Sequence, residues 1–140
     1  VHYSIIAQDQ PSEEILYKID DLSLQGHVTL TCLDSQEDVY RKMSSSDCLL
    51  LPSVEEGIAN VVLEAMAIGL PVISSDCGGM REVIEHEKDG FLFRNRDVNH
   101  LAQIMTDMIN QHSDERKSMS KRARLKIEQN HDISRNHSFA

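Results

Sequence analysis

The chain has 140 residues, of which 40% are hydrophobic and 26% are charged, and its formal net charge is −9. This length and composition fit one globular domain and exclude an intrinsically disordered chain, which would carry fewer aliphatic residues. No apolar run approaches the roughly 20 residues that a membrane-spanning helix needs. The three cysteines are odd in number and lack CxxC spacing, so neither a disulfide scaffold nor a zinc knuckle is expected. The acidic balance also argues against a nucleic-acid-binding surface.

Strand and helix patterns alternate along the whole chain, beginning with a strand. Apolar runs predict five strands, at residues 2–8, 28–33, 47–52, 71–75 and 91–93. Apolar residues at helical spacing predict helices that end at Gly26, begin at Ser35, cover residues 59–68 and 80–86, begin at Asp97, and begin near Ser113. Ser35 with Asp38 resembles a capping box, and Asp97 is an expected helix cap.

This alternation predicts an α/β fold with a Rossmann-like, doubly wound parallel sheet. Strands joined to helices by short links imply right-handed crossovers and a sheet covered on both faces. No repeat, linker or shift in composition marks a second domain, so residues 1–140 are expected to form one domain. Open sheets of this kind bind ligands beyond the carboxyl ends of their strands. We therefore expect functional residues directly after the predicted strands.

The densest signal is the segment at residues 53–71, which directly follows the third predicted strand. Gly57 allows a close backbone approach, and the amides of residues 58–61 would be unpaired donors at a helix start. Such an end attracts phosphate through its N–H groups and its dipole. An ordinary strand-to-helix turn with Asn60 as the cap explains the same residues.

Two glutamates in this segment are candidates for ligand contact. Glu64 lies in a predicted helix that is apolar nearly all round, where a carboxylate is costly unless it is hydrogen-bonded. A ribose diol would be a suitable donor pair, and a nearby arginine or backbone amide would serve equally. Glu56 lies on the preceding loop, where by itself it fits a solvated surface carboxylate.

Glu56 and Glu64 lie eight residues apart within PSVEEGIANVVLEAMAIGLPVISSDCGGMREVI, which is followed by GFLF. Together these features resemble retaining GT-B glycosyltransferases of family 4 type. The resemblance covers residues 47–92 in motif, spacing and strand–helix order, and extends more weakly over most of the chain. It implies the C-terminal, donor-binding half of a GT-B fold. The implied reaction transfers a sugar from a nucleoside diphosphate to an acceptor hydroxyl, with retention at the anomeric carbon and no obligatory metal or cofactor.

The resemblance also implies a role for each matching residue. Glu56, the candidate catalytic residue, would accept hydrogen bonds from the transferred sugar, and Glu64 would bind the ribose hydroxyls. The amides that would hold the distal phosphate belong to Gly57, Ile58, Ala59, Asn60 and Val61. The nucleotide base would lie near Cys32 and Leu33. Gly78 and Gly79 would let the backbone approach the ligand at the same edge, although a simple tight turn explains them as well.

The sequence departs from the family pattern in three respects. Cys32 stands where the family usually has glycine, and its side chain could narrow the base site. An earlier strand with an arginine and a lysine that neutralise the diphosphate has no counterpart here, and neither has the N-terminal acceptor domain. We therefore expect a truncated donor domain that is inactive alone and binds nucleotide weakly.

The expected partners are a nucleoside diphosphate sugar and, through the missing domain, a glycan, lipid-linked or small-molecule acceptor. A cytoplasmic setting is expected. The basic residues between Arg116 and Lys126 could contact the inner face of a membrane, although a solvated helix face also explains them. The seven scattered histidines predict no metal site. A non-catalytic nucleotide-binding or interaction module and a GT-B-like sugar-nucleotide epimerase are the alternatives.

Overall fold

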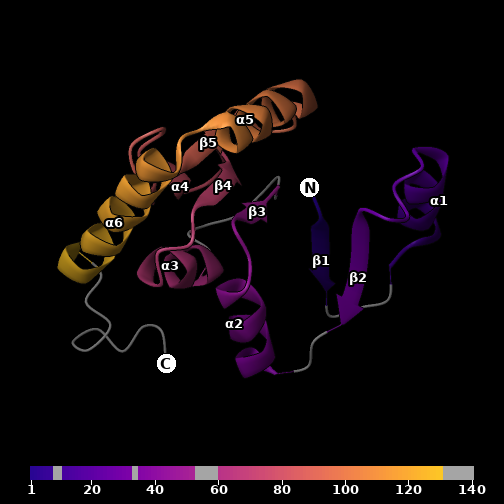
Figure 1. The fold of residues 1–140 in the computed structure, drawn as a ribbon, viewed down its shortest axis with the longest axis horizontal. Helices are drawn as coiled ribbons and strands as arrows, with labels where there is room; N and C mark the ends of the chain where they lie inside the picture. Colours follow the sequence, from indigo (N-terminus) through magenta and orange to yellow (C-terminus); the bar gives the residue numbers. More distant parts are fainter. Residues whose placement is uncertain (8–10, 33–34, 53–59, 131–140) are drawn as a thin grey trace. The chain divides into compact units, whose positions relative to one another are not determined.

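A computed structural model describes residues 1–7, 11–32, 35–52 and 60–130 of the chain. The chain falls into two compact units, Val1–Lys42 and Met43–Ala140. Among the described residues, the strands form a two-stranded parallel sheet in the first unit and a three-stranded parallel sheet in the second (Figure 1). The predicted α/β class with parallel strands is confirmed.

The first unit contains a strand–helix–strand motif, made of β1 (Tyr3–Ala7), α1 (Glu13–Asp21) and β2 (Val28–Cys32). The two strands pair in parallel over their full lengths. Ser12 caps α1, because its hydroxyl accepts the N–H of Ile15 at 3.3 Å. The helix stops short of the predicted end at Gly26. Ser23 adopts a left-handed conformation with φ 55°, and its N–H bonds to the Asp20 carbonyl, which closes the last turn.

Helix α2 (Gln36–Ser44) crosses the boundary between the units, and the Ser35 hydroxyl accepts the N–H of Asp38 at 3.0 Å, as one half of the predicted capping box. The second unit then contains, in chain order, β3 (Leu49–Leu51), α3 (Asn60–Ala67), β4 (Val72–Ser75), α4 (Met80–Val83), β5 (Phe91–Phe93), α5 (Val98–Asn110) and α6 (Ser113–Asn130). Its strands lie in the order β3–β4–β5.

The central strand β4 is buried along its whole length. The core cluster beside it joins residues of β4, β5, α5 and α6, namely Ile73, Phe91, Phe93, Ile104, Met108 and Met119. The last two residues of β4 are the buried serines Ser74 and Ser75. The Ser74 hydroxyl is satisfied in the core, because it donates to the Ser75 carbonyl at 3.0 Å. The predicted cap of α5 is confirmed, since the Asp97 carboxylate accepts the N–H of His100.

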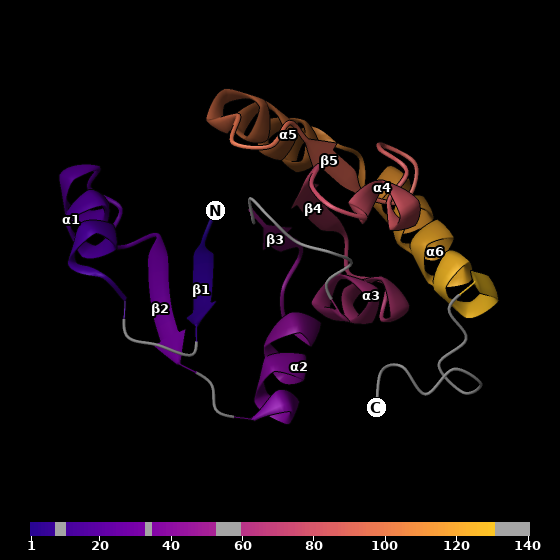
Figure 2. The same ribbon diagram turned by 180° about the vertical axis from the view of Figure 1, so that it is seen from behind.

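Helix α6 buries one narrow apolar stripe. Met119, Ala123 and Ile127 are 1%, 1% and 2% exposed, and their spacing of four places them on one helix face. The helix packs against α3, beside which it lies in both views (Figures 1 and 2). Most of the basic side chains of α6 are exposed around the stripe, as a solvated helix face requires.

A buried ion pair ties α6 to the segment that follows α4. Asp89 is 3% exposed, and its carboxylate pairs with Lys126 and accepts the N–H of Glu85 at 2.8 Å. Lys126 also donates to the carbonyl of Val83 at 2.8 Å. Because these contacts hold the end of α4, the helix stops before the predicted end at residue 86, and Ile84 is extended.

The buried stripe of α6 predicts an asymmetric response to truncation of its side chains. Ile127→Ala should lower the free energy of unfolding by about 3 kcal/mol, because it leaves a cavity at a buried position of α6. Leu125→Ala, at a side chain that is 43% exposed, should cost less than about 1 kcal/mol. Urea unfolding of both variants checks this, and equal losses would contradict the packing.

Candidate functional site

The predicted site residues divide between described and undescribed parts of the chain. Leu33, Glu56, Gly57, Ile58 and Ala59 lie outside the described residues. Cys32 is an exposed residue at the end of β2, in the first unit. The second unit holds the other described candidates, which are Asn60, Val61 and Glu64 on α3, and Gly78 and Gly79 between β4 and α4.

The candidates of the second unit belong to connections that leave one edge of its sheet. Because β3, β4 and β5 are parallel, their carboxyl ends lie at the same edge. The N–H of Asp76, the first residue after β4, donates to the Phe93 carbonyl at 2.8 Å. This bond brings the connection after β4 next to the exit of β5. The described candidates of the second unit therefore follow strands whose carboxyl ends lie at one edge of the sheet.

Helix α3 presents one of its faces to the core and another to solvent. Val62, Leu63, Ala65 and Met66 are buried, whereas Asn60 is exposed and Glu64 is half-buried. Asn60 and Glu64 are four residues apart and therefore share a helix face. The first N–H groups of any helix lack intrahelical acceptors, and Glu64 lies one turn after Asn60, the first described residue of α3.

The Glu64 carboxylate is held in a partly desolvated position. Burial raises the pKa of this group above its ordinary value. The sequence-based expectation that a carboxylate on this apolar helix carries a desolvation cost agrees with that direction. A ligand that donates hydrogen bonds to the carboxylate would lower this cost.

The turn between β4 and α4 needs glycine at one of its two glycine positions. Gly78 has φ 55°, a left-handed conformation that favours glycine, whereas Gly79 has φ −91° and directly precedes α4. The turn brings the chain from the buried strand to α4 within a few residues. A tight turn explains Gly78 fully, and close approach of a ligand to either glycine stays a prediction.

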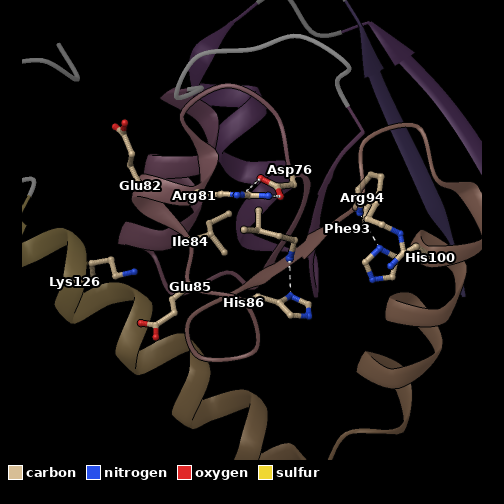
Figure 3. A pocket seen from close by; sticks show the side chains of 11 residues that line it. Asp76, Arg81, Glu82, Ile84, Glu85, His86, Phe93, Arg94, His100 and Lys126 are labelled. Carbon is tan, nitrogen blue, oxygen red and sulfur yellow. Dashed lines mark hydrogen bonds and ion pairs between the residues drawn. The ribbon is translucent and has the colours of Figure 1, made fainter.

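An arginine at this turn is held by the carboxylate that follows β4. The Nε of Arg81 donates to both carboxylate oxygens of Asp76 at 2.8 Å, and its Nη2 lies 2.6 Å from Oδ2 (Figure 3). The hydrogen bond and the charge of Asp76 raise the pKa of the guanidinium. The Arg81 side chain is nevertheless 79% exposed. The Arg81 guanidinium is therefore held in place at this edge of the sheet, and the Asp76 carboxylate balances its charge.

Asp76 and Arg81 line an open pocket of about 590 Å³ beside the carboxyl ends of β4 and β5 (Figure 3). Its other walls come from the segment after α4, from β5, from the start of α5 and from the end of α6, and include His86, Phe93, Arg94, His100 and Lys126. The sequence interpretation did not single out Arg94 or His100. The position of Arg94 directly after β5 was the available signal, because ligand sites follow strand ends in such sheets.

Within the described ranges, no group of histidine, cysteine, aspartate or glutamate side chains is arranged to hold a metal ion. A search of the same residues finds no helix with the length and apolar character needed to cross a bilayer.

Comparison with known proteins adds a family to this geometry. Residues 4–126 match the family described as "Glycosyl transferases group 1". The amylovoran biosynthesis glycosyltransferase AmsK of Erwinia amylovora is 37% identical over 109 residues, which cover 74% of this chain and 27% of that protein. The putative colanic acid biosynthesis glycosyltransferase WcaL of Escherichia coli is 34% identical over 122 residues, covering 83% of this chain and 30% of that protein. The chain thus spans less than a third of these relatives.

Solved structures share the fold. Anabaena HepE in complex with UDP superposes with a TM-score of 0.82 at 26% identity, over 89% of this chain and 34% of HepE. Sucrose-phosphate synthase of Thermosynechococcus elongatus superposes with a TM-score of 0.86 at 23% identity, over 95% of this chain and 35% of that protein. These superpositions confirm the predicted GT-B type of α/β fold.

The raised pKa of Glu64 predicts how a Glu64→Gln variant responds to pH. The folded wild-type chain binds this proton more tightly than the unfolded chain, so its stability falls as pH rises through the carboxyl range. The stability of Glu64→Gln relative to wild type should therefore increase between about pH 4 and pH 7. Denaturant titrations at several pH values measure this difference. Glu128→Gln, at an exposed residue of α6, is the control, and a pH-independent difference at Glu64 would refute the assignment.

The left-handed conformation of Gly78 predicts a second stability effect. Gly78→Ala should lower the free energy of unfolding by about 1–2 kcal/mol, because alanine is strained at this φ. Gly26→Ala is the matched control, since no atom lies within 4 Å of the position its Cβ would take. Thermal unfolding of both variants checks the expectation, which fails if Gly78→Ala is as stable as Gly26→Ala.

Proposed function

The chain belongs to the group 1 glycosyl transferases, and from this premise we propose that it forms the donor-binding part of a retaining glycosyltransferase. Its substrate would be a nucleoside diphosphate sugar, from which the complete enzyme transfers the sugar to an acceptor hydroxyl. Curated relatives named as biosynthesis glycosyltransferases support the class of activity. HepE has been solved with UDP and with UDP-glucose, which supports a nucleotide-sugar donor.

The observation that carries this proposal is the placement of Glu64 on α3. The carboxylate lies one turn after the start of a helix, on the same face as Asn60, and in a partly desolvated position. A ribose diol would supply two donors to this carboxylate, while the amides at the start of α3 would donate hydrogen bonds to the distal phosphate. The amides assigned to the phosphate are those of Gly57, Ile58, Ala59, Asn60 and Val61.

The remaining roles follow from the resemblance of the motif to retaining GT-B enzymes. Glu56 would bind hydroxyls of the transferred sugar, and the base would lie near Cys32 and Leu33. Helix amides aimed at the departing diphosphate would stabilise the charge that develops on it in the transition state. We propose a reaction of this kind that requires no metal ion and takes its acceptor from a second domain.

The charges at the sheet edge bear on how tightly the donor binds. Arg81 is the cation next to Gly78 and Gly79, and its charge is matched by Asp76. The helix dipole contributes about 0.3–1 kcal/mol at an exposed end. Because Asp76 matches the charge of Arg81, these contributions support weak binding of a diphosphate by the 140-residue chain alone.

Calorimetric titration with UDP tests the proposed role of Glu64. The 140-residue chain should bind UDP with a dissociation constant well above about 1 μM, and Glu64→Ala should weaken binding about 10-fold to 100-fold, because hydrogen bonds to a charged carboxylate are lost. Glu128→Ala should leave the affinity unchanged. Submicromolar binding by the wild-type chain would contradict the weak-binding expectation, and equal affinity of wild type and Glu64→Ala would contradict the ribose role. Repeating the titration with GDP and ADP identifies the preferred base.

A further inference from the structure

The strand β5 forms the outer edge of the β3–β4–β5 sheet, since among the described strands it pairs with β4 alone. Backbone groups of alternate residues in a strand point to opposite sides. The Phe93 carbonyl faces β4, where it accepts the N–H of Asp76. The N–H groups of Leu92 and Arg94 point the other way, along the edge that β4 does not cover.

Both of these N–H groups donate to histidine rings. The N–H of Leu92 bonds to Nδ1 of His86 at 2.9 Å, and the N–H of Arg94 bonds to Nδ1 of His100 at 2.8 Å (Figure 3). The two rings come from different elements. His86 lies in the segment before β5, and His100 lies in the first turn of α5.

Each ring is held in place by a second contact. His86 is edge-on to Phe91, with ring centroids 6.0 Å apart, and its residue forms a bridge with Gly90. The backbone N–H of His100 donates to the Asp97 carboxylate at 2.9 Å, while the same carboxylate accepts from Nε of Arg94 at 2.9 Å. The acceptor nitrogens are therefore positioned by the surrounding structure.

The chemistry of imidazole makes these two bonds sensitive to acid. A ring nitrogen accepts a hydrogen bond only while it carries a lone pair, so a neutral ring in this arrangement has its proton on Nε2. A proton added to Nδ1 occupies the position of the bond and places a cation against an amide N–H. We propose that His86 and His100 form a pH-sensitive seal on the outer edge of this sheet, closed at neutral pH and opened by acid.

The seal would keep β5 from pairing with another chain, because unpaired N–H groups on an edge strand are a template for such pairing. Because protonation of Nδ1 removes the acceptor of each bond, protection of the edge should fall as pH falls. Sealing of the sheet edge does not depend on donor binding.

Charged groups of both signs surround the two rings. His100 faces Arg94 and Asp97 and shares its pocket with Asp76 and Arg81. The Nε2 of His86 lies 3.3 Å from a Glu87 carboxylate oxygen. The other charged or titratable groups that line the pockets on either side of His86 include Glu85, Lys126, Asp107, His112 and Glu115. Each bond itself depends on the Nδ1 lone pair, which protonation of that nitrogen removes.

Amide hydrogen exchange of the 140-residue chain, followed by NMR at pH 7.5 and pH 5.5, tests the seal directly. After correction for the intrinsic rate, protection of the Leu92 and Arg94 amides should fall about fivefold or more at pH 5.5, as expected for one lost hydrogen bond at each. The amide of Ile73, in the central strand, should keep its protection, which separates local opening from global unfolding. Unchanged protection at Leu92 and Arg94 would overturn the inference.

Substitutions of the two histidines distinguish the presence of a hydrogen-bond acceptor from its sensitivity to pH. Asparagine places an oxygen close to the Nδ1 position, so His86→Asn should keep the protection of Leu92 but lose its pH dependence, and His100→Asn should do the same for Arg94. His86→Leu should lower the protection of Leu92 at both pH values. His112→Asn, in the exposed link between α5 and α6, should change neither amide. A His86→Asn chain whose Leu92 amide still responds to acid would refute the role of His86.

Discussion

The packing of α6 against α3 is the interaction on which the candidate site depends. Helix α6 contacts α3, and its stripe of Met119, Ala123 and Ile127 is buried. With Val62 and Met66 turned inward, Asn60 and Glu64 are left toward solvent. The Asp89–Lys126 pair reinforces the same docking, because it joins α6 to the end of α4. A helix far from the motif in sequence thus determines which side of the motif a ligand can reach.

The acidity of the chain has a local counterpart at the sheet edge. Arg81 lies beside the glycine turn, but Asp76 holds it with a bidentate contact, and Arg94 is similarly engaged by Asp97. Each cation is thereby positioned, and each is also balanced by a carboxylate. Such pairs favour fixed geometry over net attraction, so a diphosphate at this edge would rely largely on helix amides.

Local chemistry explains why much of the fold was predictable. The caps at Ser35 and Asp97 and the apolar run of β4 act within a few residues, so their patterns are visible in sequence. The predicted ends of α1 and α4 were wrong. The end of α1 depends on the left-handed conformation of Ser23, and the end of α4 depends on Lys126, which comes from a distant helix. At the site, strand order and the glutamate motif pointed to α3. The histidine contacts of β5 had no sequence signal, since they join residues through the folded edge.

The late position of α6 has a consequence for synthesis of the protein on the ribosome. When α3 leaves the ribosome with its apolar face, the end of α6, which includes Ile127, is still untranslated. At typical elongation rates this interval lasts roughly several seconds, during which Val62 and Met66 lack their partner helix. The nascent chain therefore offers an adhesive surface to chaperones or to neighbouring chains on the same message. Packing of the ligand-facing helix is therefore completed only after α6 has left the exit tunnel.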